Sequence, residues 1–206
     1  MPTLYTLKPR FQALLRPLVT GMARAGISAN QVTILAAVIS VIVGGIIIVS
    51  DSRQAFSLLP IWFLVRMGLN AVDGMLAREF GQKSTLGAYL NELGDVVADA
   101  ALVAPFAIVA PFAPAWVFAV IFLGALSEYA GVMGPLAGAG RRYDGPFGKS
   151  DRALLFGALG LWIGIGGALP PWTAWIMPAL TVLLAMTVIN RVRNGVVEAA
   201  SNKDVR

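Results

Sequence analysis

The sequence from Val32 to Ser50 reads VTILAAVISVIVGGIIIVS and contains no charged residue. An α-helix needs about 20 apolar residues to cross the hydrocarbon core of a bilayer, and these 19 residues come close to that length. The whole chain is similar in character, because 57% of its 206 residues are hydrophobic and 13% are charged, with a mean hydropathy of +0.75. Soluble domains carry about 25% charged residues. The composition therefore excludes a water-soluble globule and a disordered chain.

Uncharged runs elsewhere predict further membrane spans. Residues 100–127 and 153–190 are each too long for one span, and each contains two prolines near its middle, so each is interpreted as two helices joined by a turn. Another apolar segment, 55–80, is interrupted by charged residues. We expect spans near 30–50, 55–80, 84–110, 114–138, 151–169 and 172–193. The sequence thus predicts an all-α integral membrane protein with six transmembrane helices in a single domain, residues 1–206.

Basic residues gather in segments that would lie on one side of the membrane. They are Lys8, Arg10, Arg16, Arg24, Arg78, Lys83, Arg141, Arg142, Lys149, Arg152, Arg191, Arg193, Lys203 and Arg206. The opposite loops carry only Arg53. By the positive-inside rule, both termini and the basic loops are expected in the cytoplasm of a multi-pass protein of the cell (inner) membrane. This distribution explains the net charge of +5 without nucleic acid as a partner.

The segment before the first span predicts a further helix at about residues 4–26. Its apolar residues recur at helical spacing, and its basic residues lie largely off that stripe. This pattern is typical of an amphipathic helix on the cytoplasmic membrane surface. A helix packed against its own domain fits the same pattern.

Polar residues concentrate where the second expected span leads into the third. Asn70 and Asp73 share one helix face, and Asn91, Asp95 and Asp99 share another. The two helices are consecutive and joined by a short loop, so both faces can converge near the cytoplasmic end. The chain has no histidine and no cysteine, and oxygen ligands alone suit a hard cation such as Mg²⁺. The alternative is that these groups only bind helix to helix through an internal ion pair.

This segment resembles the signature of the CDP-alcohol phosphatidyltransferases. The residues that match in identity and spacing are Asp73, Gly74, Ala77, Arg78, Gly87 and Asp95. The resemblance implies transfer of a phosphatidyl group from CDP-diacylglycerol to a polar alcohol with release of CMP, in phospholipid biosynthesis. It also implies Mg²⁺ or Mn²⁺ as the cofactor, an active site at the cytoplasmic face, membrane lipid as a partner, and a homodimer.

The resemblance assigns the roles of the family's site residues to matching positions in three segments of this chain. Asp95 is expected to be the catalytic base. The expected metal ligands are Asp73, Asp95, Asn70 and Asn91. The expected contacts to the CDP-lipid are Asn30, Gln31, Val32, Thr33, Gly74, Ala77, Arg78, Ser84 and Gly87. For residues 30–33, a helix start capped by Ser28 or Asn30 is an equal interpretation.

Basic residues at the ends of the last two spans suggest how the alcohol is held. We hypothesise that a phosphate on the acceptor, such as that of glycerol 3-phosphate, meets some of Lys149, Arg152, Arg191 and Arg193. Anchoring of the spans by the positive-inside rule would account for the same residues.

Asn70 and Asn91 stand where the family signature has aspartate. An amide oxygen can bind a cation but brings no charge, so we predict weak metal binding with one ion, compensated by carboxylates such as Asp99, Glu92 and Glu128. The departure also leaves open a non-catalytic descendant that binds nucleotide-lipid or a membrane partner. A small ion transporter is a third alternative, although it would need more polar residues at the far end of the spans.

Overall fold

The computed structural model describes residues 4–50, 52–166 and 168–204, and within them the secondary structure is entirely helical. The elements in chain order are α1 (Leu4–Arg24), α2 (Ala29–Val49), η1 (Arg53–Ser57), α3 (Leu58–Glu79), α4 (Thr85–Val103), η2 (Ala104–Ile108), α5 (Pro114–Leu136), α6 (Lys149–Gly166), η3 (Pro171–Trp175) and α7 (Ile176–Asp204). The prolines expected to separate helices lie where α5 and η3 begin.

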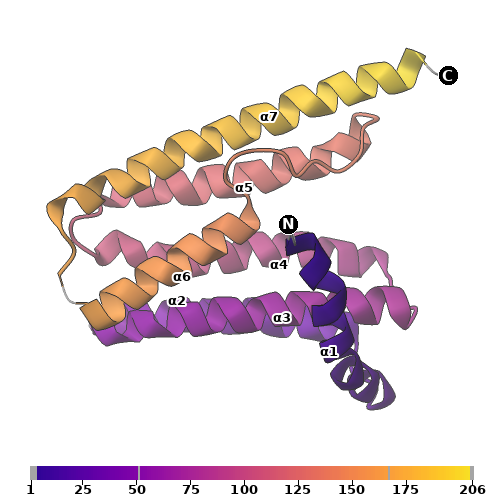
Figure 1. Ribbon diagram of the computed structural model, residues 1–206, viewed down its shortest axis with the longest axis horizontal. Helices are drawn as coiled ribbons and strands as arrows, with labels where there is room; N and C mark the ends of the chain where they lie inside the picture. Colours follow the sequence, from indigo (N-terminus) through magenta and orange to yellow (C-terminus); the bar gives the residue numbers. More distant parts are fainter. Residues whose placement is uncertain (1–3, 51, 167, 205–206) are drawn as a thin grey trace.

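The helices α2 to α7 form an elongated bundle (Figure 1). Helix α2 packs against α3 and α4, α5 packs along α7, and α6 lies against α3. Helix α1 crosses one end of the bundle, beside the end of α3. That end also holds the loops from α3 to α4 and from α5 to α6, so distant parts of the chain meet there.

Within the described residues, four helical segments are long and apolar enough to cross a membrane, judged by length and composition. They are Ala29–Val49, Arg53–Glu79, Pro114–Leu136 and Pro171–Asn202. The remaining two long helices of the bundle, α4 and α6, carry several ionisable residues of the candidate site. The all-helical class is therefore confirmed, and the four segments are candidate membrane spans. The expected count of six spans stays a prediction that depends on α4 and α6.

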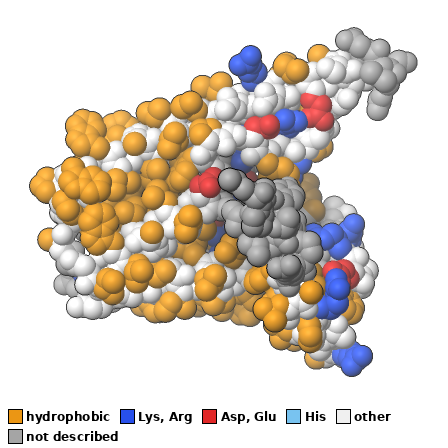
Figure 2. Space-filling model, in the orientation of Figure 1, with side chains coloured by type: hydrophobic (Ala, Val, Ile, Leu, Met, Phe, Trp, Pro, Cys, Tyr) orange, Lys and Arg blue, Asp and Glu red, His pale blue; other side chains and the backbone are white. Residues whose placement is uncertain are grey.

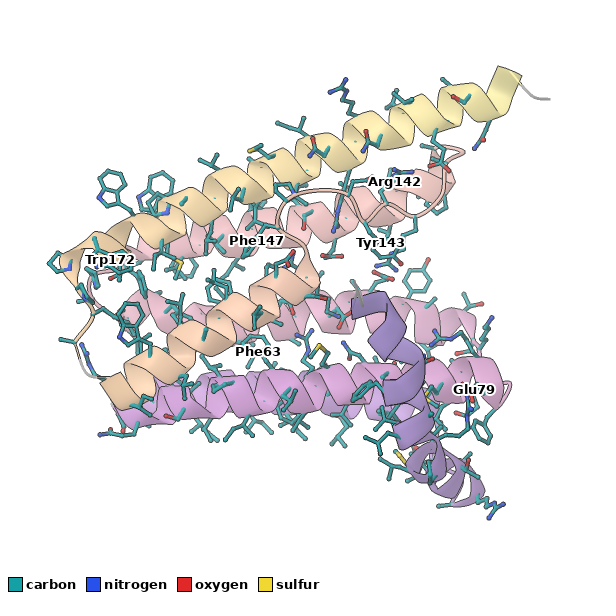
Figure 3. All side chains as sticks on the ribbon, in the orientation of Figure 1. Phe63, Glu79, Arg142, Tyr143, Phe147 and Trp172 are labelled. Carbon is teal, nitrogen blue, oxygen red and sulfur yellow. The ribbon has the colours of Figure 1, made fainter. Side chains whose placement is uncertain are left out.

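Apolar and charged side chains gather at opposite ends of the bundle. Figure 2 shows hydrophobic side chains over the end where α6 leads into α7, and Lys, Arg, Asp and Glu gathered toward the opposite end. Trp172 and Trp175, both exposed, lie at the apolar end (Trp172 is labelled in Figure 3). Exposed tryptophans are typical of the level where a membrane meets water. The apolar core includes Phe106, whose ring contacts the rings of Phe56 and Phe156.

Local sequence fixes where the site-bearing helices begin and how closely they approach. Ser28 caps α2 through a reciprocal pair of hydrogen bonds with Gln31, and this confirms Ser28 as the cap. At Gly44, a Cβ atom would lie 2.2 Å from the backbone oxygen of Ala101, so only glycine permits this approach of α2 to α4. Near the start of the same two helices, Asn30 of α2 lies beside Gly87 of α4.

Helix α1 has one packed face and one exposed face. Val19 is fully buried against Met75 and Leu76 of α3, and Arg16 forms an ion pair with Glu79 at 3.2 Å. Other apolar side chains, such as Leu14 at 77% exposure, face outward. Packing against its own domain is thus observed, while contact with a membrane surface stays a prediction. Helix α7 runs to Asp204, past the expected end at 193, because no proline follows to interrupt it.

Candidate functional site

A polar cavity of about 330 Å³ lies where three helix ends meet. The start of α2, the end of α3 and the start of α4 form its walls. The expected site residues that line it are Asn30, Thr33, Asp73, Gly74, Ala77, Arg78, Ser84, Gly87, Asn91 and Glu92. The structure therefore brings together most of the expected contacts to the nucleotide. We call this space the first cavity.

Two glycines keep the first cavity open. At Gly74, a Cβ atom would lie 2.8 Å from Nη2 of Arg78, because the guanidinium of that exposed side chain folds back over the glycine. At Gly87, a Cβ atom would lie 2.7 Å from Oδ1 of Asn30 and 2.9 Å from Oγ of Ser84. Ser84 also caps α4 by accepting a hydrogen bond from the Gly87 N–H. The absent side chains thus make room for polar groups that face the cavity.

Two expected contacts lie away from the first cavity. The side chain of Gln31 is used in the cap of α2, where its Oε1 accepts from the Ser28 N–H at 2.8 Å. Val32 is buried in the apolar cluster between α2 and α3. Both departures follow from helix geometry, since four consecutive helical residues cannot face one side.

Asp73 is a buried carboxylate on the wall of the first cavity. It is 6% exposed and accepts a hydrogen bond of 2.8 Å from the Thr33 hydroxyl. Within the described chain, no Lys or Arg lies within salt-bridge distance of it. A buried carboxylate without a cationic partner suits a bound cation. Asn91 lines the same cavity and could add a neutral oxygen ligand.

A second cavity, of about 390 Å³, lies between α4, α6, α7 and the loop from α5 to α6. Lys149 and Arg191, two of the proposed acceptor-binding residues, line it. Asp95 lies on its wall, and Asn91 lines both the first and the second cavity. The two spaces therefore meet at one face of α4, with Asp73 in one and Asp95 in the other.

Asp95 is held by two cationic side chains. Its Oδ1 accepts from Nη2 of Arg66 at 3.0 Å and lies 3.5 Å from Nδ2 of Asn70. Its Oδ2 pairs with Nζ of Lys149. Asn70 thus binds the carboxylate from α3 and lines neither cavity. The residues suit a single cation near Asp73 better than a cation at Asp95, whose charge is already balanced.

The carboxylates considered as compensation for the missing aspartates are also paired. Asp99 bonds Arg66 at 2.5 Å and Arg152 at 2.9 Å. Glu128 bonds Arg152 at 3.0 Å, and Glu92 bonds Arg141 at 2.8 Å. In the described part of the chain, no three acidic side chains are grouped so that they could enclose a metal ion. Asp99 and Glu128 thus neutralise buried arginines, and Glu92 neutralises the half-buried Arg141.

Arg152 and Arg193 lie away from the second cavity. Arg152 is 5% exposed and turned toward Asp99 and Glu128, while Arg193 is exposed on α7. On α7, residues 191 and 193 are separated by about 200° of helical turn, so they cannot face one cavity together. Of the four basic residues, Lys149 and Arg191 are the two that line it.

Sequence reasoning missed Gln82 and Arg141. Gln82 lines the first cavity and accepts from the Ala29 N–H at 2.7 Å, which ties the α3–α4 loop to the start of α2. Arg141 lines the second cavity and lies over the ring of Tyr143, 5.1 Å from its centroid. Figure 3 shows Tyr143 on the loop between α5 and α6. The run Arg141-Arg142-Tyr143-Asp144 directly after a span was the available signal.

Comparison with known proteins gives relatives over most of the chain. Inner membrane protein YnbA of Escherichia coli (strain K12) is 41% identical over 195 residues, which cover 93% of this chain and 96% of that protein. The crystal structure of phosphatidylinositol phosphate synthase from Mycobacterium tuberculosis with CDP-DAG bound matches with a TM-score of 0.72. That match has 20% identity and covers 87% of this chain and 92% of the other.

The same enzyme in complex with manganese and citrate matches with a TM-score of 0.68 at 21% identity, over 87% of each chain. At these identities the two crystal structures show a shared fold. The family model described as CDP-alcohol phosphatidyltransferase matches residues 26–187, which include every helix that lines the first cavity. With the signature of α3 and α4 gathered around one cavity, the chain belongs to the CDP-alcohol phosphatidyltransferase family.

Proposed function

We propose that this protein moves a phosphatidyl group from CDP-diacylglycerol to a polar alcohol and releases CMP. The observation that carries the proposal is the meeting of two polar cavities at Asn91 on α4. The first contains the family signature, and the second contains Asp95 among basic side chains. A transfer between two substrates needs two adjoining sites of this kind.

The first cavity would bind the CDP part of the donor. Arg78 can meet a phosphate with charge-assisted hydrogen bonds, and Asn30 and Ser84 offer polar contacts beside Gly87. Asp73, with the Asn91 amide, would hold a Mg²⁺ or Mn²⁺ ion. When bound, that cation supplies positive charge that offsets the charge of the diphosphate.

The second cavity would hold the alcohol, with Asp95 as the base. The alcohol oxygen forms a bond to the phosphorus attached to diacylglycerol, the bond from that phosphorus to the bridging oxygen breaks, and CMP leaves with that oxygen. Asp95 takes the hydroxyl proton through Oδ2, which Lys149 would release when it turns to the acceptor. Lys149, Arg141 and Arg191 together favour an acceptor that carries a phosphate.

An apolar groove beside the second cavity could take an acyl chain of the donor. Phe63 and Met67 of α3 and Leu154 of α6 line this space of about 250 Å³. Ser150 belongs to both the groove and the second cavity, so the apolar and polar spaces adjoin. The groove shares no lining residue with the first cavity, so an acyl chain of a donor whose nucleotide lies there would pass the second cavity to reach the groove.

We infer the inner membrane as the location, supported by the apolar helices and by the name of the Escherichia coli relative. The basic residues at the charged end favour cytoplasmic termini and a cytoplasmic site. A homodimer remains a proposal from the family. The second candidate function, a non-catalytic binder of nucleotide-lipid, is favoured by the pairing of Asp95 with both Arg66 and Lys149.

The test is CMP release by the purified protein in detergent, with CDP-diacylglycerol, Mn²⁺ and a panel of free and phosphorylated alcohols. We expect release that depends on one phosphorylated alcohol and is lost in Asp95→Asn. Lys149→Gln should raise KM for that alcohol with little change in KM for the CDP-lipid. Binding of the CDP-lipid without release for any alcohol, and release gained in Asn70→Asp/Asn91→Asp, would favour the non-catalytic candidate.

A further inference from the structure

Arg66 is a cation buried within a helix long and apolar enough to cross a membrane. Its side chain is 4% exposed. Nη1 donates to Oδ1 of Asp99 at 2.5 Å, while Nη2 donates to Oδ1 of Asp95 at 3.0 Å and to the backbone oxygen of Asp95 at 3.2 Å. A charged group inside a membrane span is energetically costly unless it is paired. Such a group usually has a functional role.

The charge of Arg66 is permanent. A guanidinium does not lose its proton in proteins, and three hydrogen bonds to α4 fix this one in place. Lys149 differs, because its side chain is 31% exposed and sits at the start of α6, facing the second cavity. Lys149 can move toward a ligand, whereas Arg66 can leave Asp95 only by giving up two hydrogen bonds in a buried site.

The two oxygens of Asp95 are therefore unequal. Oδ1 faces α3, where Arg66 and Asn70 both approach it. Oδ2 faces Lys149 at the second cavity. Among the residues that the structure describes, no Lys or Arg lies within salt-bridge distance of Asp73, one turn along α3 from Asn70. Positive charge is thus supplied by the protein at Asp95 and is missing at Asp73.

We propose that Arg66 acts as a resident counter-cation, which occupies the place beside Asp95 that a second divalent cation would need and leaves Asp73 as the single cation site. In this role Arg66 is a positioning residue: it holds Oδ1 of Asp95 so that Oδ2 faces the second cavity. The inference rests on the proposed function for its catalytic meaning, but its charge argument concerns metal binding alone.

The test is the binding of Mn²⁺ to the purified protein in detergent, measured by the electron paramagnetic resonance signal of free Mn²⁺ without any nucleotide or lipid. We expect one Mn²⁺ per wild-type chain. Arg66→Met frees Oδ1 of Asp95 and removes a positive charge that repels Mn²⁺. We therefore expect either a second bound Mn²⁺ ion or at least about tenfold tighter Mn²⁺ binding. Arg66→Lys keeps the charge and should keep a single ion.

Arg152→Met is the matched control, since it also removes a buried arginine bonded to Asp99 but makes no contact with Asp95. It should leave Mn²⁺ binding as in the wild type. The double variant Arg66→Gln/Asp99→Asn removes both charges at once, leaves no unpaired Asp99, and protects the test against misfolding of Arg66→Met. Because it also frees Oδ1 of Asp95, we expect a second bound Mn²⁺ ion or tighter binding than in the wild type, but a smaller gain than in Arg66→Met, since a negative charge is lost as well.

Two equally tight Mn²⁺ ions in the wild type would overturn the inference. Unchanged Mn²⁺ binding in whichever of Arg66→Met and Arg66→Gln/Asp99→Asn folds would also overturn it. Neither result depends on turnover. A chain that fails to release CMP yet shows the expected Mn²⁺ pattern supports the role of Arg66 and contradicts the proposed function. An active chain that binds two Mn²⁺ ions tightly would support the proposed function and contradict the role of Arg66.

Discussion

Replacement of Gly74 by alanine should impair donor binding without harming the fold. The added Cβ would lie 2.8 Å and 3.0 Å from the two terminal nitrogens of Arg78, so the guanidinium must leave its position over residue 74. Charge-assisted hydrogen bonds contribute about 1.5–3 kcal/mol. Their loss corresponds to a fall of roughly 10- to 100-fold in kcat/KM for CDP-diacylglycerol. The displaced group is the end of an exposed, flexible side chain, so the fold should tolerate the change.

Gly68→Ala is the matched control for this prediction. Gly68 lies in the same helix, and a Cβ there would meet nothing within 4 Å. Both substitutions gain up to about 1 kcal/mol of helix propensity, so neither should lower the thermal midpoint in detergent. The assay is CMP release at varied CDP-diacylglycerol. The prediction would be refuted if Gly74→Ala kept the wild-type kcat/KM while Arg78→Met was strongly impaired. In that case a Cβ at residue 74 would not displace the Arg78 guanidinium.

Two further predictions concern the scaffold. Gly44→Ala should greatly lower the melting temperature, because its Cβ would lie 2.2 Å from the Ala101 oxygen. Gly45→Ala should not, because a Cβ at that position would meet nothing within 4 Å. Equal melting temperatures of the two variants would contradict the close α2–α4 contact. In the α5–α6 loop, hydrogen bonds from Arg142 lower the pKa of Asp144 below its ordinary value of 3.8. This stabilisation is complete above that value and is lost as pH falls through the lower folded pKa. The melting difference between wild type and Asp144→Asn should therefore hold from pH 7 to about 4.5 and shrink below pH 4; a difference that shrinks already near pH 6 would contradict the assignment.

The sequence predicted the all-helical membrane class because uncharged runs and prolines are local signals. The span at 32–50 and the turns at the proline pairs needed no knowledge of tertiary contacts. The convergence of α3 and α4 was also predictable, since Asp73 and Asp95 lie on consecutive helices joined by a short loop. A periodic pattern cannot tell which face of α1 packs and which stays exposed, and both faces are apolar in part.

The second cavity was only partly predictable. Lys149 and Arg191 come from helices that are far apart in sequence, and the α5–α6 loop that adds Arg141 has no periodic pattern. The pairing of Arg66 with Asp95 and Asp99 depends on which face of α3 is turned toward α4. Sequence spacing gives the faces of each helix but not the register between two helices.

The most direct test of the account is an experimental structure of the protein with CDP-diacylglycerol and Mn²⁺. The account predicts the diphosphate in the first cavity beside Gly74 and Arg78, one Mn²⁺ ion at Asp73, and Arg66 still bonded to Asp95. A nucleotide bound outside the first cavity, or a metal ion seated between Asp95 and Arg66, would contradict it.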